Sequence, residues 1–172
     1  MQKVITGKTH VFGNNIDTDQ IYPGRYLELV DPSEIAKHCL EGARESFVDE
    51  FKPGQLVVGG TNFGCGSSRE HAAITLKSIG VGAVVAKSFA RIFYRNAINL
   101  GLPLVVCPEV DTLKLSGQQI TIDLENGTVT NDQSGANVTC EPISEYAMQI
   151  LSYGGIKNMI RAQRAPSGCV EG

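Results

Sequence analysis

The chain has 172 residues, 42 % of them hydrophobic, and its 15 Lys and Arg against 18 Asp and Glu leave a formal net charge of −3. This length corresponds to roughly one domain with a real apolar core, which excludes a disordered chain. The lack of a basic excess argues against nucleic-acid binding, and no apolar run reaches the roughly 18–20 residues of a membrane span. Residues 1–7 lack the apolar region of a signal peptide, so we expect a cytoplasmic protein.

The cysteines predict neither a disulfide framework nor a metal centre. They are odd in number, widely spaced and without a Cys-x-x-Cys pair, and the chain has only three His. If the protein works with a metal, another chain must therefore supply most of its ligands. The five are Cys39, Cys65, Cys107, Cys140 and Cys169.

The N-terminal third predicts a strand, a long polar loop and two short helices. The strand covers residues 4–12, the loop 17–25, the first helix about 32–39 and the second about 45–51. Asp31 is the expected N-cap of the first helix, with Pro32 at its first position.

The middle of the chain alternates strands and helices. Apolar runs predict strands at 55–58, 83–86 and 104–107, and helical spacing predicts helices at 67–79 and 90–100. This alternation is typical of parallel strands joined by crossover helices.

The C-terminal third changes period. Alternating residues at 119–124 and 128–130 flank Asn126-Gly127, which predicts a hairpin. A helical region follows at 143–164, broken at Gly154-Gly155, and the last eight residues read as a flexible tail. We therefore expect an α/β protein with a parallel sheet core and a C-terminal hairpin and helix, in a single domain at 1–164 with a tail at 165–172.

Residues 62–71, Asn-Phe-Gly-Cys-Gly-Ser-Ser-Arg-Glu-His, carry the clearest chemical signal. Glycines let backbone N–H groups approach a ligand, and the predicted helix directs its first N–H groups at the same place. Ser67, Ser68 and Arg69 add donors, and an arginine binds a carboxylate through two hydrogen bonds. The stretch predicts an anion site, above all for a carboxylate. Equally open is the interpretation that Ser67 and Glu70 only form a capping box at the helix start.

Three further features have a chemical and a structural interpretation. One carboxylate of residues 17–19, Asp-Thr-Asp, would orient a hydroxyl or arginine of the anion site, or the stretch is a self-bonded turn. Arg91 and Arg95 lie beyond the carboxyl end of a strand, where α/β ligands collect, or on a solvated helix face. His71 is a base or a satisfied structural histidine.

Residues 17–19, 62–72 and 86–96 together resemble the small subunits of 3-isopropylmalate dehydratase, in the aconitase superfamily. Homoaconitase and 2,3-dimethylmalate dehydratase small subunits are close relatives, and the likeness covers roughly residues 2–164. The last of the three stretches reads Ala-Lys-Ser-Phe-Ala-Arg-Ile-Phe-Tyr-Arg-Asn. The resemblance implies a swivelling β/β/α domain split off as a separate subunit.

It also implies a hydro-lyase that isomerises 2-isopropylmalate to 3-isopropylmalate by dehydration and rehydration, in leucine biosynthesis. The large subunit would hold a [4Fe-4S] cluster, and this chain would supply no metal ligand and be inactive without its partner. By match to the family motif, Ser67 would be the catalytic base and Asp19 an active-site carboxylate. Ser68 and Arg69 would bind the substrate carboxylate.

The family's substrate-reading loop corresponds to residues 24–29, with Tyr26, Leu27, Glu28 and Leu29 as its specificity residues. Relatives that bind an additional carboxylate commonly have Arg after Tyr-Leu, where this chain has Glu28. The loop therefore favours an alkyl-substituted malate, and Arg25 is the candidate for the loop arginine that binds substrate.

Three alternatives stay open. The chain would serve a related dehydratase acting on 2,3-dimethylmalate, citramalate or homocitrate and homoaconitate, or it would be a carboxylate-sensing module or a scaffold subunit without catalysis. The last two differ from the first in predicting unchanged turnover after Ser67→Ala.

Overall fold

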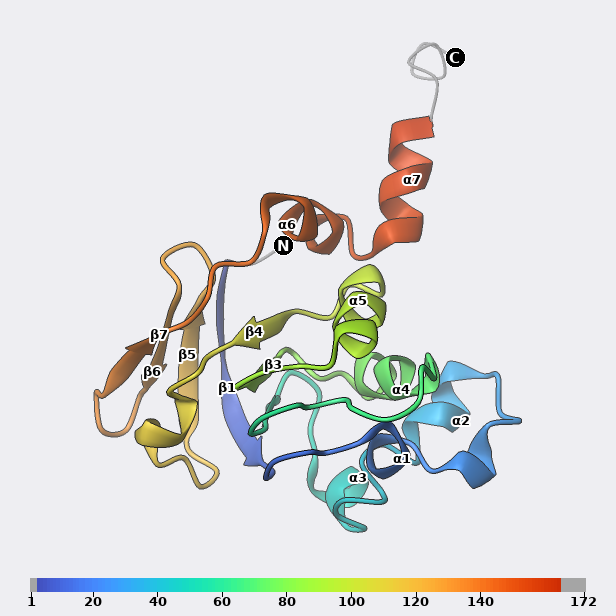
Figure 1. Ribbon diagram of the computed structural model, residues 1–172, viewed down its shortest axis with the longest axis horizontal. Helices are drawn as coiled ribbons and strands as arrows, with labels where there is room; N and C mark the ends of the chain where they lie inside the picture. Colours follow the sequence, from blue (N-terminus) through green and yellow to red (C-terminus); the bar gives the residue numbers. More distant parts are fainter. Residues whose placement is uncertain (1–2, 165–172) are drawn as a thin grey trace.

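The structure, a computed structural model, describes residues 3–164 and contains a seven-stranded mixed sheet in the order β4-β3-β2-β1-β5-β6-β7 (Figure 1). The strands are β1 (Val4–Val11), β2 (Leu56–Val58), β3 (Val84–Ala86), β4 (Leu104–Val106), β5 (Gln119–Asp123), β6 (Thr128–Asn131) and β7 (Asn137–Thr139). The helices are α1 (Thr18–Ile21), α2 (Pro32–Ala36), α3 (Phe47–Glu50), α4 (His71–Ile79), α5 (Arg91–Asn99), α6 (Glu145–Ser152) and α7 (Ile156–Arg164), with 3-10 turns η1 (Gly24–Tyr26) and η2 (Val110–Leu113). Within this part of the chain, no helix is long and apolar enough to cross a membrane.

The parallel half of the sheet positions the loops of interest. Strands β2, β3 and β4 pair in parallel, as the sequence predicts, and β1 adds a fourth parallel strand beside β2. Val11, Val58, Val85 and Val105 align across the four strands. The carboxyl ends of these strands therefore share one edge of the sheet, where ligands collect in α/β folds.

The parallel strands are buried on both faces. On one face, Val57 and Val84 belong to a core shared with α4, α5 and α6. On the other face, Val58 and Val85 pack into a core with Ile120 and other side chains of the antiparallel half. Figure 1 shows α4 and α5 on one side of β3 and β4, and β5, β6 and β7 on the other side, beyond β1. The predicted α/β class with a β/β/α arrangement is confirmed.

The antiparallel half of the sheet joins the parallel half through the pairing of β5 with β1. The predicted hairpin forms β5 and β6, and β5 pairs antiparallel with β1, with Ile5 opposite Ile122. The third strand, β7, is absent from the sequence prediction because its three residues, Asn137–Thr139, are polar or partly exposed and show no buried alternation.

Several boundaries correct the sequence prediction. The helix expected at 67–79 begins only at His71, and the helix expected at 32–39 ends at Ala36 and continues as turns. The polar loop at 17–25 contains α1 and η1. The break at Gly154-Gly155 is confirmed, since it separates α6 from α7. The single domain at 1–164 stays a prediction, and the tail at 165–172 lies outside the described residues.

Candidate active site

The glycine-rich loop after β2 is fixed by backbone hydrogen bonds to the segment after β1. The Gly64 N–H donates to the Ile16 carbonyl at 2.7 Å, and the Thr18 N–H donates to the Cys65 carbonyl at 2.8 Å. These bonds place the start of α1 directly beside the loop. The loop thus has a defined path rather than that of a solvated turn.

Its other side is held by the segment between β3 and α5. The Phe63 N–H donates to the Ser88 carbonyl at 3.0 Å, and the Ala90 N–H donates to the Phe63 carbonyl at 3.0 Å. Gly64 has a φ of 85°, and a Cβ at this position would clash with the ring of Phe93. Only glycine fits there, because the backbone is left-handed and the helix α5 approaches closely.

Helix α1 presents a hydroxyl to Ser67. Asp17 caps this helix by accepting the Gln20 N–H at 2.7 Å, and Gln20 Oε1 accepts the Asp17 N–H at 3.0 Å. The Thr18 side chain is buried, and its Oγ1 accepts the Ser67 N–H at 3.2 Å and lies 3.1 Å from Ser67 Oγ. Thr18 therefore fixes both the backbone and the hydroxyl of Ser67.

The next residue of α1, Asp19, holds Arg69. Asp19 Oδ1 accepts a hydrogen bond from Arg69 Nη1 at 3.1 Å and another from the Gly24 N–H at 2.8 Å. The Gly24 N–H and the Arg69 guanidinium together hold the pKa of the Asp19 carboxyl below its usual range. The carboxylate thus orients the guanidinium, as one of the two sequence interpretations proposed. Asp17 follows the other interpretation, the self-bonded turn.

Ser67 does not cap the following helix. The N-cap of α4 is Glu70, whose side chain makes no capping hydrogen bond. The interpretation of Ser67 and Glu70 as a capping box is therefore wrong, and so is a helix start at Ser67. Both Ser67 and Ser68 are exposed in the loop before α4. The hydroxyls are accessible because the chain stays irregular until His71.

The loop at 24–29 is anchored at two carbonyls. The Tyr22 hydroxyl donates to the Tyr26 carbonyl at 2.6 Å, and His71 Nε2 lies 3.2 Å from the Leu29 carbonyl. His71 also stacks on Tyr22, with ring centroids 5.2 Å apart, which fits the structural interpretation of this histidine. The exposed tip between the anchors consists of Leu27 and Glu28.

Arg25 is bonded to Glu41. Its Nη2 lies 2.8 Å from Glu41 Oε2, and its guanidinium sits over the Tyr26 ring at 4.8 Å from the centroid. The structure therefore brings Ser67, Arg69 and Asp19 together and leaves Arg25 in a separate ion pair.

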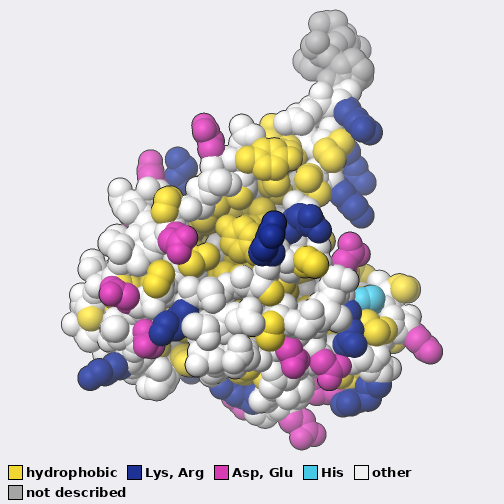
Figure 2. Space-filling model, in the orientation of Figure 1, with side chains coloured by type: hydrophobic (Ala, Val, Ile, Leu, Met, Phe, Trp, Pro, Cys, Tyr) yellow, Lys and Arg dark blue, Asp and Glu magenta, His cyan; other side chains and the backbone are white. Residues whose placement is uncertain are grey.

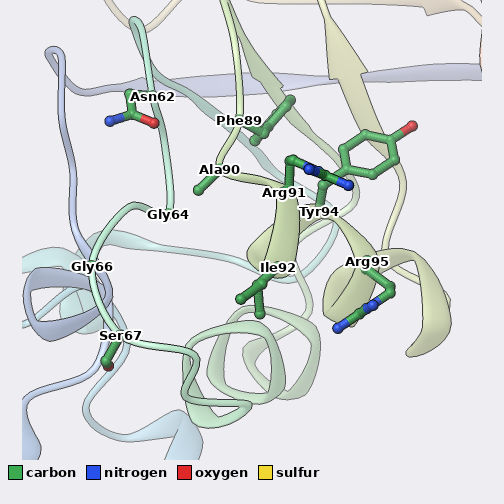
Figure 3. Close-up of a pocket in the computed structure, with 10 residues that line it drawn as sticks. All are labelled: Asn62, Gly64, Gly66, Ser67, Phe89, Ala90, Arg91, Ile92, Tyr94 and Arg95. Carbon is green, nitrogen blue, oxygen red and sulfur yellow. The ribbon is translucent and has the colours of Figure 1, made fainter.

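A cleft of about 780 Å³ opens beside Ser67 (Figure 3). The loop forms one wall, with Gly64, Gly66 and Ser67, and α5 forms the other. Arg91 and Arg95 project from α5 into this region, at positions that the sequence interpretation left open between a ligand site and a solvated face. Their spacing of four residues was the available signal, but only the packing of α5 against the loop places both of them on the wall of the cleft.

The described residues contain no group of three or more His, Cys, Asp or Glu that could hold a metal ion. Burial raises the pKa of the Cys39 thiol strongly and that of Cys107 to about 12, so both stay protonated rather than becoming thiolate ligands. The side chains described here do not fit a [4Fe-4S] cluster.

The chain belongs to the aconitase C-terminal domain family, which matches residues 1–109. The resemblance seen in the sequence is thereby confirmed.

The relatives narrow the family further. The chain is 53 % identical over 163 residues to 3-isopropylmalate dehydratase small subunit 1 of Methanopyrus kandleri, covering 95 % of this chain and 96 % of that protein. It is 44 % identical to the isopropylmalate/citramalate isomerase small subunit of Methanocaldococcus jannaschii, over 97 % of this chain and 99 % of that one. A crystal structure of 3-isopropylmalate dehydratase from M. jannaschii superposes with a TM-score of 0.89 at 43 % identity, covering 94 % of this chain and 95 % of that chain.

Proposed function

We propose that this chain is the small subunit of a 3-isopropylmalate dehydratase, a hydro-lyase that isomerises 2-isopropylmalate to 3-isopropylmalate in leucine biosynthesis. The proposal is carried by one observation: two consecutive residues of α1, Thr18 and Asp19, hold the Ser67 hydroxyl and the Arg69 guanidinium. Similarity to named small subunits over nearly the whole chain supports it. The same names imply a large-subunit partner.

Ser67 acts as the catalytic base in this proposal. Its Oγ removes the proton from the carbon next to a substrate carboxylate, and the resulting carbanion loses hydroxide from the neighbouring carbon to give an alkene. A serine hydroxyl is ordinarily far too weak a base for this step. The Thr18 hydroxyl at 3.1 Å and the positive charge of Arg69 favour the ionised oxygen, because a hydrogen bond and a nearby cation both stabilise an anion.

Arg69 and Ser68 bind the substrate carboxylate, and Asp19 is the residue that positions Arg69. A guanidinium already fixed by a carboxylate loses little conformational entropy when a ligand arrives. Arg25 joins the substrate site only by leaving Glu41, to which it is bonded here at 2.8 Å.

The iron-sulfur cluster belongs on the large subunit in this proposal, because the described residues of this chain do not fit it. When bound there, it supplies Lewis-acid activation of the substrate hydroxyl that leaves. The residues of this chain contribute the proton transfer and the carboxylate contacts.

Substrate choice is assigned to the loop at 24–29. The exposed tip carries Leu27 beside Glu28. A carboxylate at Glu28 repels a substrate with a third carboxylate, such as homocitrate, and Leu27 and Leu29 offer apolar contact to an alkyl branch. Citramalate is the nearest competing substrate, because a relative named for both substrates is 44 % identical.

The test is co-expression with the large subunit encoded beside this chain, followed by anaerobic cluster reconstitution. Alkene formation is followed from 2-isopropylmalate, citramalate, 2,3-dimethylmalate, homocitrate and citrate. Ser67→Ala is the test variant, and Ser78→Ala makes the same chemical change at an exposed position on α4.

Turnover of 2-isopropylmalate that is lost in Ser67→Ala and kept in Ser78→Ala supports the proposal. Preference for homocitrate or citrate contradicts the specificity assignment while leaving the family intact. An assembled, cluster-loaded complex with full turnover in Ser67→Ala contradicts the role of Ser67 and favours a scaffold or sensing subunit.

A further inference from the structure

The wall of the cleft opposite Ser67 carries exposed cations and no acid. Arg91, Ile92 and Arg95 line this wall on α5, and none of the ten residues that line the cleft is Asp or Glu. All three side chains are exposed, with Ile92 at 46 %. The whole chain has a net charge of −3, so this wall is a local concentration of positive charge.

Neither arginine is used within the part of the chain that the structure describes. Arg69 pairs with Asp19 and Arg25 pairs with Glu41, but Arg91 and Arg95 make no ion pair or side-chain hydrogen bond within residues 3–164. Figure 2 shows dark-blue side chains gathered over α5 beside a hydrophobic hollow, with more along α7 on the same face of the molecule. Within the described residues, the two arginines of this surface therefore have no acidic side chain bonded to them.

The proposed function determines what must approach this wall. In the proposed function the substrate lies between Ser67 of this chain and the large subunit that carries the cluster, so the large subunit must reach the mouth of the cleft. Because α5 forms the other side of the same cleft, its outward residues come within contact distance of that subunit. A guanidinium buried in an interface without a carboxylate partner would cost several kcal/mol in lost hydration.

We infer that Arg91, Ile92 and Arg95 form a docking surface for an acidic patch on the large subunit. Ile92 supplies the apolar contact, and the two arginines at i and i+4 pair with carboxylates of the partner. This inference rests on the proposed function, because it names the surface through which the two subunits meet at the site of Ser67. Paired charges of this kind contribute to the rate and the specificity of association more than to the raw affinity.

The same two arginines would bind a substrate carboxylate if the cleft closed around a small molecule instead. The two cases differ in measurable ways. A docking role affects the dissociation constant of the subunits and its dependence on salt. A substrate role affects the KM of the assembled enzyme and leaves assembly unchanged.

The test uses the full chain and the cluster-loaded large subunit. The subunit dissociation constant is measured by sedimentation at low and high salt for wild type, Arg91→Gln/Arg95→Gln and Arg91→Glu/Arg95→Glu. The matched control, Lys8→Gln/Lys52→Gln, also removes two exposed positive charges, at positions outside the cleft. Circular dichroism and thermal unfolding confirm that each variant is folded.

We expect the glutamine pair to weaken assembly by about tenfold and the glutamate pair by about a hundredfold, with a shallower salt dependence. The lysine control assembles like wild type, and KM at saturating large subunit stays within about twofold of wild type. Unchanged assembly in both arginine variants overturns the inference, and an increase in KM without a change in assembly assigns the arginines to the substrate. A wild-type chain that neither binds nor activates the large subunit overturns the proposed function and this inference with it.

Discussion

The contact between Thr18 and Ser67 gives a sharp prediction. Thr18→Val keeps the shape of the side chain and removes the hydroxyl that accepts the Ser67 N–H at 3.2 Å and lies 3.1 Å from Ser67 Oγ. Thr18 is only 3 % exposed, whereas Ser67 is exposed. Water therefore replaces part of what Ser67 loses, and the free energy of unfolding falls by only about 1 kcal/mol.

The effect on catalysis is larger than the effect on stability. In the proposed mechanism the Thr18 hydroxyl donates to an ionised Ser67 oxygen, and a hydrogen bond to a charged group contributes about 1.5–3 kcal/mol. Since about 1.4 kcal/mol corresponds to a factor of ten, kcat falls by about ten- to a hundredfold. Thr18→Ser keeps the hydroxyl and is expected to retain kcat within about threefold.

The measurement pairs urea unfolding of the small subunit with kcat of the reconstituted complex at saturating substrate. A loss of about 1 kcal/mol in stability together with wild-type kcat would refute the reasoning, because Thr18 would then only support the loop. Equal loss of kcat in Thr18→Ser and Thr18→Val would also refute it, because keeping the hydroxyl would then give no advantage.

Three further predictions concern the surroundings of the site. Asp19→Asn removes the charge that holds Arg69 and should raise KM by about tenfold. Because folding lowers the pKa of Asp19, the ionised carboxylate stabilises the fold above about pH 4, and this stabilisation is lost as pH falls through the lowered pKa. The free energies of unfolding of wild type and Asp19→Asn should therefore converge in acid. Gly64→Ala should lower the free energy of unfolding by about 3 kcal/mol or more, because φ is 85° and the new Cβ meets Phe93. The control Gly13→Ala has open space around the new Cβ and should change the free energy of unfolding by less than about 0.5 kcal/mol. Equal shifts in the thermal unfolding of the two variants would contradict this prediction. Burial raises the pKa of Cys39, so stability should fall above about pH 8.5 by up to about 1.4 kcal/mol per pH unit, and a Cys39→Ala variant with the same alkaline slope in urea unfolding would rule this cause out.

Local patterns in the sequence were sufficient wherever short-range periodicity decides the structure. Apolar runs and helical spacing located the parallel strands and their crossover helices, Asn126-Gly127 located the hairpin, and Gly154-Gly155 located the break before α7. The combination of Gly64, Gly66 and the serine-serine-arginine stretch marked the site. Each of these signals depends on residues a few positions apart.

The sequence also contains a capping box that the prediction did not include. Asp17 and Gln20 have the spacing of a capping box, and they do begin α1. The similar spacing of Ser67 and Glu70 was ambiguous, and there the chain stays irregular. A competing contact decided the second case: Thr18, 49 residues away in sequence, takes the Ser67 backbone and hydroxyl.

Only the tertiary structure could decide which side chains meet. The pairing of β1 with β2 brings the loop after one strand beside the loop after the other, so Thr18 meets Ser67 and Asp19 meets Arg69. The same packing turns Arg25 toward Glu41 and faces α5 to the cleft. The sequence by itself determined the elements and the residue types of the site, because these follow from local spacing. The register of distant strands, which no local pattern encodes, determined the contacts that give those residues their roles.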